Sequence, residues 1–134
     1  MSDRIILDAT AALAAIFGET GGDFLEKLEQ EPETIMTSVN AAEAVSKMIQ
    51  RGFTPADARA AFREIVKRVL VAAEGMAFEA AEIHARNRAL GLSMGDCFCL
   101  AAGMVTGVAV YTADREWMKL RRLNALGIRV VLIR

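Results

Sequence analysis

The stretch GLSMGDCFCLAAGMVTGVAVYTAD, residues 91–114, contains 17 consecutive uncharged residues between Asp96 and Asp114. A membrane-spanning helix needs about 20 apolar residues in one continuous run. Here Gly103 and Gly107 interrupt the run, and the residues that follow Gly107 are a short group rich in β-branched side chains. The stretch therefore predicts a buried helix that ends at Gly107, followed by a buried strand, and not a membrane span.

Short apolar runs alternate with helical patterns along the rest of the chain. We expect strands over residues 4–7, 34–38, 69–72, 108–111 and 129–133. We expect helices over residues 9–18, 22–31, 40–52, 53–68, 76–91 and 95–106, and a short helical turn from Arg115. Continuous apolar strands are typical of a parallel sheet that helices cover on both faces. The sequence therefore predicts an α/β fold with a small parallel sheet.

The composition of the 134-residue chain suits one domain, over residues 1–134. Apolar residues make up 54% of the chain, and this excess predicts that a partner covers part of the surface. Cys97 and Cys99 are two positions apart, so on a helix they point to opposite sides and form neither a disulfide nor a zinc clamp. With no disulfide or signal-peptide pattern, we expect a cytoplasmic protein.

The charged residues are distributed unevenly, although the net charge of −1 does not by itself indicate a nucleic-acid-binding protein. Residues 115–134 contain six basic residues and a single acid. A local basic surface can bind a phosphate backbone, and an ordinary solvated face has the same pattern. The basic residues are Arg115, Lys119, Arg121, Arg122, Arg129 and Arg134.

Three aspartates lie near the ends of expected strands. Asp8 directly follows the strand over 4–7, Asp114 shortly follows the strand over 108–111, and Asp96 begins the helix that leads into that second strand. Ligand sites of open parallel sheets form beyond the carboxyl ends of the strands. We therefore expect these carboxylates to gather at one edge of the sheet, although capping a helix is the ordinary role of Asp8 or Asp114 taken singly.

Asp96 is the hardest of the three to explain as a simple cap, because Ser93 can already cap the same helix. An acid at the start of a buried helix needs a partner or a metal ion. An apolar stripe at helical spacing predicts that this helix is buried. The stripe consists of Cys97, Leu100, Ala101, Met104 and Val105.

Glu43 is a fourth candidate, on the helix that follows residues 34–38. It stands four residues before Lys47, which is the favourable order for an exposed ion pair. The apolar face of this helix is expected to be Ala42, Val45 and Ile49. Spacing alone therefore favours a surface position for Glu43.

Clustered carboxylates point to divalent-metal chemistry. Close carboxylates repel each other, and Mg²⁺ or Mn²⁺, which prefer oxygen ligands, would relieve that repulsion. Such a metal can activate water for phosphodiester hydrolysis, and Thr10 and Thr112 could orient the carboxylates. The single histidine, His84, has no visible catalytic partner pattern, and no phosphate-binding glycine loop is present.

Four segments together resemble the PIN domain of bacterial VapC-type toxins. IILDATAALAAI (5–16) resembles the segment with the first acid, and SVNAAEAV (38–45) resembles the helical Glu motif. GLSMGDCFCLAAG (91–103) and VYTADREW (110–117) resemble the segments with the third acid and the final T-x-D element. The order and spacing of these motifs fit across nearly the whole chain.

The resemblance implies a three-layer αβα sandwich with a small parallel sheet. It implies an endoribonuclease that depends on Mg²⁺ or Mn²⁺, with Asp8, Glu43, Asp96 and Asp114 as its catalytic and metal-binding acids. It further implies an RNA substrate and a VapB-like antitoxin as partner. The apolar excess suggests a homodimer, and we expect Arg115, Lys119, Arg121 and Arg122 to bind the RNA backbone.

Two other functions remain open from the sequence. One is a catalytically inactive PIN-like module that binds RNA or protein without cutting. The other is a phosphate-handling domain with Asp8 as phosphoryl acceptor, which is less favoured because no second acid stands beside Asp8 and no lysine follows a strand end.

Overall fold

The computed structural model describes residues 3–120 and 127–134 and contains a five-stranded parallel sheet in the order β3-β2-β1-β4-β5. The strands are β1 (Arg4–Leu7), β2 (Glu33–Thr37), β3 (Arg68–Leu70), β4 (Val110–Thr112) and β5 (Val130–Leu132). The helices are α1 (Ala9–Phe17), α2 (Ser38–Gln50), α3 (Pro55–Ile65), α4 (Glu74–Arg86) and α5 (Met94–Thr106), with 3₁₀ turns η1 (Arg88–Leu90) and η2 (Arg115–Lys119).

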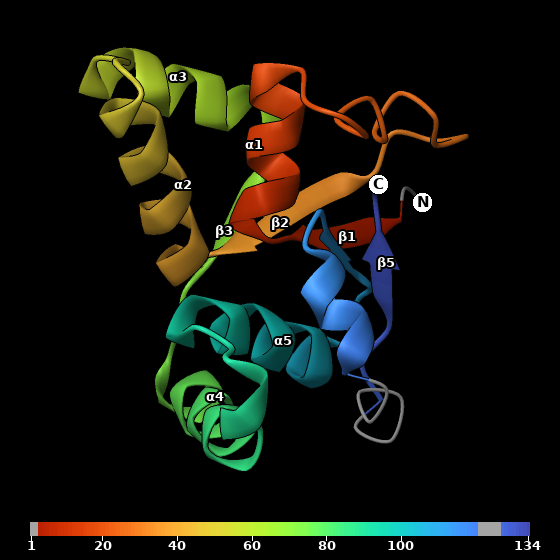
Figure 1. The fold of residues 1–134 in the computed structure, drawn as a ribbon. Helices are drawn as coiled ribbons and strands as arrows, with labels where there is room; N and C mark the ends of the chain where they lie inside the picture. The colour runs from red at the N-terminus through yellow and green to blue at the C-terminus, as the bar shows by residue number, and fades with distance from the viewer. Residues whose placement is uncertain (1–2, 121–126) are drawn as a thin grey trace.

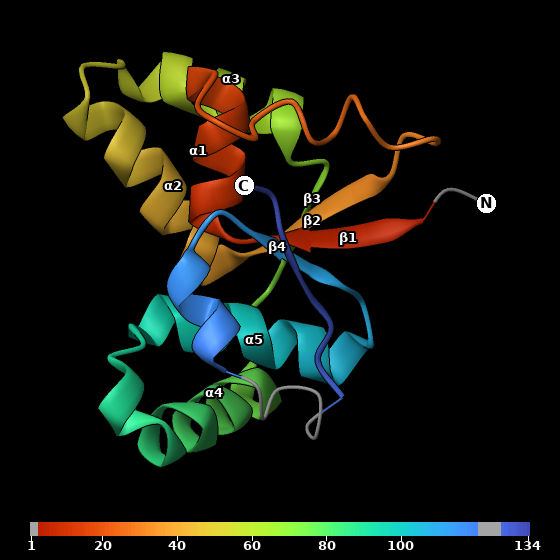
Figure 2. The same cartoon turned by 45° about the vertical axis from the view of Figure 1, so that its right-hand side comes forward.

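The helices form a layer on each face of the sheet. Figures 1 and 2 show α1, α2 and α3 on one side and α4 and α5 on the other. Neighbouring side chains of β1 point in opposite directions, so Ile6 packs with α4 and α5 while Ile5 and Leu7 pack with α1, α2 and α3. The predicted α/β fold, a three-layer sandwich with a small parallel sheet, is confirmed.

Helix α5 begins and ends as its sequence predicts. At its start the Ser93 side chain accepts from the Asp96 amide while the Asp96 side chain accepts from the Ser93 amide, which is a capping box. At its end Gly107 takes the left-handed conformation, with φ of 71°. The predicted apolar stripe is wrong at Val105, which is 60% exposed, because the buried face turns toward Cys99 and Ala102 instead.

The helix predicted over residues 22–31 is wrong. This segment forms successive turns, in which amides bond to the carbonyl three residues earlier, as from Phe24 to Gly21 and from Lys27 to Phe24. Gly21 has a positive φ of 81°, which is outside the helical region. The segment is held by Phe24, which is buried and stacks on Tyr111 at 5.7 Å between ring centroids.

Within residues 3–120 and 127–134, every helix is too short or too polar to cross a lipid bilayer. The apolar run of residues 97–113 is accounted for by α5 and β4, as the sequence predicts.

Candidate functional site

Asp8 occupies the carboxyl end of the central strand β1, where the chain turns into α1. Its Oδ1 accepts a hydrogen bond from the Ala11 amide at 2.8 Å, so Asp8 is the N-cap of α1. Asp8 is only 3% exposed, which is far more burial than a cap on the protein surface has. The ordinary role as a cap is therefore real, and it leaves the burial of the carboxylate unexplained.

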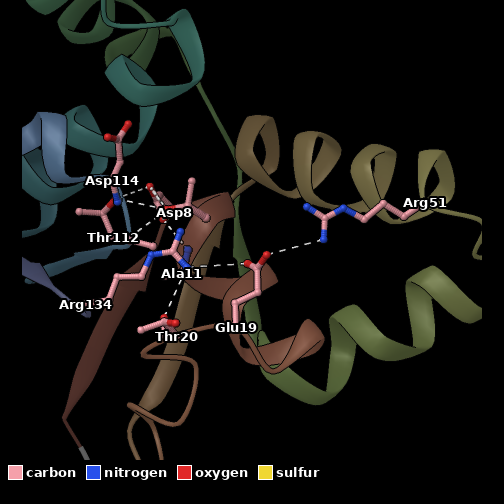
Figure 3. A network of polar contacts seen from close by, with 10 residues as sticks. Asp8, Ala11, Glu19, Thr20, Arg51, Thr112, Asp114 and Arg134 are labelled. Carbon is pink, nitrogen blue, oxygen red and sulfur yellow. Dashed lines mark hydrogen bonds and ion pairs between the residues drawn. The ribbon is translucent and has the colours of Figure 1, made fainter.

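Two threonine hydroxyls hold the Asp8 carboxylate. Thr112 Oγ1 donates to Oδ2 at 2.6 Å, and Thr10 Oγ1 lies 2.7 Å from Oδ1 and 2.9 Å from Oδ2. The contact with Thr112 follows from strand pairing, because Leu7 is in register with Tyr111 in the neighbouring strand β4. The structure thus brings Thr10 and Thr112 together at Asp8, as Figure 3 shows for Thr112.

The pKa of Asp8 is raised from its ordinary value of 3.8 to about 6. Burial is the largest cause, since it disfavours the charged carboxylate. The hydrogen bonds from Thr112, Ala11 and Thr10 oppose the shift, and the negative charge of Asp96 adds to it. Asp96 is therefore near enough to Asp8 for their charges to repel.

The charges of Asp8, of Glu43 on α2 and of Asp96 on α5 all act on the buried thiol of Cys99. Burial raises the pKa of the Cys99 thiol well above its ordinary value, and the negative charges of Asp8, Asp96 and Glu43 raise it further. Three carboxylates distant in sequence thus lie within electrostatic range of one buried thiol. Each of them is also engaged locally, and Asp96 Oδ2 accepts from the Ser93 amide at 3.0 Å.

Glu43 lies half-buried at the edge of the buried face of α2, and the surface position predicted from its spacing is wrong. The side chains of α2 that are buried are Asn40, Ala44 and Met48, whereas the predicted apolar face includes the exposed Ala42 and Ile49. Glu43 Oε1 accepts from Asn40 Nδ2 at 2.9 Å.

Asn40 is the residue that sequence reasoning missed. It is 2% exposed, and its Nδ2 also donates to the Gly95 carbonyl of α5 at 2.9 Å. The available signal was its position three residues after Thr37, which can cap α2, and three before Glu43, which places Asn40 and Glu43 on the same side of α2.

Asp114 lies beside Asp8 and is linked to it through Thr112. Its amide donates to Thr112 Oγ1 at 3.0 Å, and its carboxylate accepts from the Glu116 amide at 2.9 Å, which caps η2. Figure 3 shows Asp114 and Thr112 beside Asp8, while Glu19, Arg51 and Arg134 form a separate surface network.

The candidate RNA-binding residues are only partly described. Arg115 is exposed at the start of η2, three positions after Thr112, the last residue of β4. Lys119 is also exposed, but its Nζ forms an ion pair with Glu116 at 2.7 Å. Arg121 and Arg122 lie outside the described residues.

The donor set at this edge fits a hard divalent cation. The groups whose charges act on Cys99 are carboxylates, the ligands that Mg²⁺ and Mn²⁺ prefer. Gly95 leaves room for one of them, because a Cβ at this position would overlap the Glu43 carboxylate. In the part of the chain that the structure describes, no three His, Cys, Asp or Glu side chains are already grouped closely enough to hold a metal ion.

The fold and the site together place this chain among α/β domains with an acidic site at the carboxyl edge of a parallel sheet. Comparison with protein families identifies which of these domains it is. The family model described as "PIN domain" matches residues 5–123, and the chain belongs to this family.

Solved structures with the same fold span nearly the whole chain. A toxin–antitoxin complex from Klebsiella pneumoniae has a TM-score of 0.71 at 11% identity, covering 97% of this chain and 98% of that one. VapC20 of Mycobacterium tuberculosis, a toxin that cleaves the sarcin–ricin loop, has a TM-score of 0.71 at 18% identity, covering 87% and 95%. VapBC-1 of nontypeable Haemophilus influenzae has a TM-score of 0.69 at 12% identity, covering 97% and 98%. Among curated protein sequences, no match is found.

Proposed function

We propose that this protein is a divalent-metal-dependent endoribonuclease and the toxin of a VapBC-type toxin–antitoxin pair, with residues 1–134 as one nuclease domain. Membership of the PIN family and the fold shared with VapC20 support this proposal. The observation that carries it is the buried Asp8 carboxylate, whose pKa of about 6 is raised in part by Asp96 from another helix. Strongly shifted pKa values of buried acids are typical of functional sites, which supports a role for Asp8 beyond capping α1.

Asp8, Glu43, Asp96 and Asp114 are the residues that would hold Mg²⁺ or Mn²⁺. When bound, the ion supplies positive charge at the scissile phosphate and lowers the pKa of a water molecule. The threonines keep the Asp8 carboxylate in one orientation, because both hydroxyls donate to it. Arg115, exposed next to Asp114, would bind a phosphate of the RNA backbone.

The partner that we propose is a VapB-like antitoxin, because several structures with this fold are toxin–antitoxin complexes. An antitoxin could place an arginine or lysine among the carboxylates and neutralise them in place of the metal. Charge reversal of the basic residues in a co-purified antitoxin should then release nuclease activity, and unchanged inhibition argues against this role of the antitoxin.

We also propose a homodimer, since the described surface includes exposed apolar side chains such as Phe78 and Val71.

The test is an RNA-cleavage assay with Mg²⁺, Mn²⁺ or EDTA. We expect cleavage by the wild type with either metal and none in EDTA. Asp96→Asn should reduce cleavage by about 100-fold or more. The matched control is Asp57→Asn, because Asp57 follows its helix cap, Thr54, at the same spacing at which Asp96 follows Ser93. Equal losses in the two variants contradict a role for Asp96 in the site.

The inactive binding module predicts a different result. It would bind RNA or protein with no metal-dependent cleavage and no Mn²⁺ affinity that depends on Asp96. A wild type that is folded and inactive with both metals therefore refutes the nuclease and leaves that alternative.

A further inference from the structure

Glu43 is held in place by contacts from two layers of the fold. Asn40, one turn earlier on α2, donates from one amide nitrogen to both Glu43 Oε1 and the Gly95 carbonyl, each at 2.9 Å. The other end of the same amide is also fixed, since Thr37 Oγ1 donates to Asn40 Oδ1 at 2.5 Å. Asn40 is 2% exposed, so water does not compete for these bonds.

Gly95 leaves the space that the Glu43 carboxylate occupies. It lies in the first turn of α5, next to Asp96, and is buried. A Cβ built on Gly95 would overlap both Glu43 oxygens. The absence of a side chain at Gly95 therefore lets the carboxylate of α2 come against the start of α5, and Asn40 keeps it there.

We propose that Asn40 and Gly95 are positioning residues that hold Glu43 beside Asp96 for metal binding. This inference rests on the proposed function, because it assigns the purpose of the arrangement to the metal site. Neither residue is a metal ligand: Asn40 acts through its hydrogen bond to Glu43, and Gly95 acts by leaving space. The competing role is a purely structural clamp between α2 and α5.

Gly95→Ala separates these roles. The group that the new Cβ meets is the end of a flexible side chain, so Glu43 can swing away at little cost, and alanine is the better helix former. The matched control is Gly75→Ala in the first turn of α4, where a Cβ meets nothing within 4 Å. We expect both variants to be at least as stable as the wild type in urea, and only Gly95→Ala to bind Mn²⁺ about 10-fold or more weakly, measured by calorimetry without RNA.

Asn40→Ala provides the second perturbation, with Asn87→Ala as control. Asn87 also donates its amide to a backbone carbonyl, that of Ile83, but at the end of α4 away from the acids. We expect Asn40→Ala to weaken Mn²⁺ binding by about 10- to 100-fold, and Asn87→Ala to leave it within about twofold. RNA cleavage should fall in parallel with Mn²⁺ affinity.

A double-mutant cycle tests whether Asn40 acts through Glu43. If it does, Asn40→Ala should cause little further loss of Mn²⁺ affinity in a Glu43→Gln background. Losses that multiply, or a Gly95→Ala variant with wild-type Mn²⁺ affinity, overturn the inference while the proposed function stands.

Absence of Mn²⁺ binding by the wild type is a different result, because it overturns the proposed function. The metal-positioning role is then overturned too, and urea unfolding tests only the structural clamp between α2 and α5. Coupling of about threefold or more between the unfolding constants of the Asn40→Ala and Glu43→Ala variants supports that clamp, and independent effects contradict it.

Discussion

The burial of Asp8 predicts that replacing it by asparagine stabilises the protein at neutral pH. Asparagine keeps the oxygen that accepts from the Ala11 amide, so the cap of α1 is retained. It removes the charge that burial disfavours. The pKa difference between about 6 in the folded protein and 3.8 corresponds to about 3 kcal/mol at 1.36 kcal/mol per pKa unit.

The sign of the pH dependence follows from proton binding. Between pH 3.8 and about 6, folded Asp8 binds more protons than unfolded Asp8, so the stability of the wild type falls as pH rises through this window. Below the window both states are protonated, and above it both are ionised and the full cost is present. The advantage of Asp8→Asn should therefore grow by about 3 kcal/mol between about pH 4 and about pH 8.

The assay is urea unfolding of both proteins across this pH range with EDTA present. In Asp8→Asn the hydroxyls of Thr10 and Thr112 face an amide group, which adds a constant to the difference in unfolding free energy between the two proteins. This constant does not vary with pH. Because burial is the larger cause and the Asp96 charge the smaller, about 0.5 M salt should leave most of the change in place. A stability difference that is constant with pH would refute the reasoning, and one that vanishes in salt would assign it to charge repulsion.

Three further predictions concern the same site. Adding Mn²⁺ at about 100 times its dissociation constant should raise the unfolding free energy of the wild type by about 2.7 kcal/mol, and should leave Asp8→Asn nearly unchanged. Because a carboxylate must be ionised to bind the metal, Mn²⁺ affinity should fall as the pH drops through about 6. Thr112→Val removes a hydrogen bond that lowers the pKa of Asp8, so it should move the midpoint of this fall to higher pH. Thr112→Ser keeps the hydroxyl and should leave the midpoint unchanged. Arg115→Ala should weaken RNA binding and reduce the slope of log binding constant against log salt concentration by about 1. Lys119→Ala should change this slope less, because Lys119 is paired with Glu116. Equal slopes in the wild type and both variants contradict this assignment.

The positions of the acids near the strand ends could be predicted from the sequence. The run 4–7 followed by Asp8, and the helix from Ser93 to Gly107 followed by β4, place carboxylates at one edge once the strands are parallel. The convergence of Asp8 and Asp96 follows from topology, which depends on apolar runs and helix caps and is therefore visible in the chain.

Glu43 and Asn40 could not be placed in this way. On α2 the apolar residues Ala42, Val45 and Ile49 suggest a buried face, but Ala42 and Ile49 are exposed and only Val45 packs partly against the core. The fully buried side chains are instead Asn40, Ala44 and Met48. A buried asparagine is stable only with partners from elsewhere in the fold, here the Gly95 carbonyl, and periodicity carries no information about that partner. The turns of residues 22–31 have the same explanation, since Phe24 is fixed by Tyr111 from a distant strand.

The central claim is that carboxylates from separate parts of the chain bind one divalent cation. A crystal structure grown with Mn²⁺, with the ion located by its anomalous scattering, tests it directly. We predict an ion at the carboxyl edge of β1 with an Asp8 oxygen about 2.1 Å away, or bridged to it by one water, and with Asp96 and Glu43 oriented toward it. Crystals that contain Mn²⁺ only at other surfaces, with the Asp8 carboxylate still bonded only to Ala11, Thr10 and Thr112, would contradict the claim.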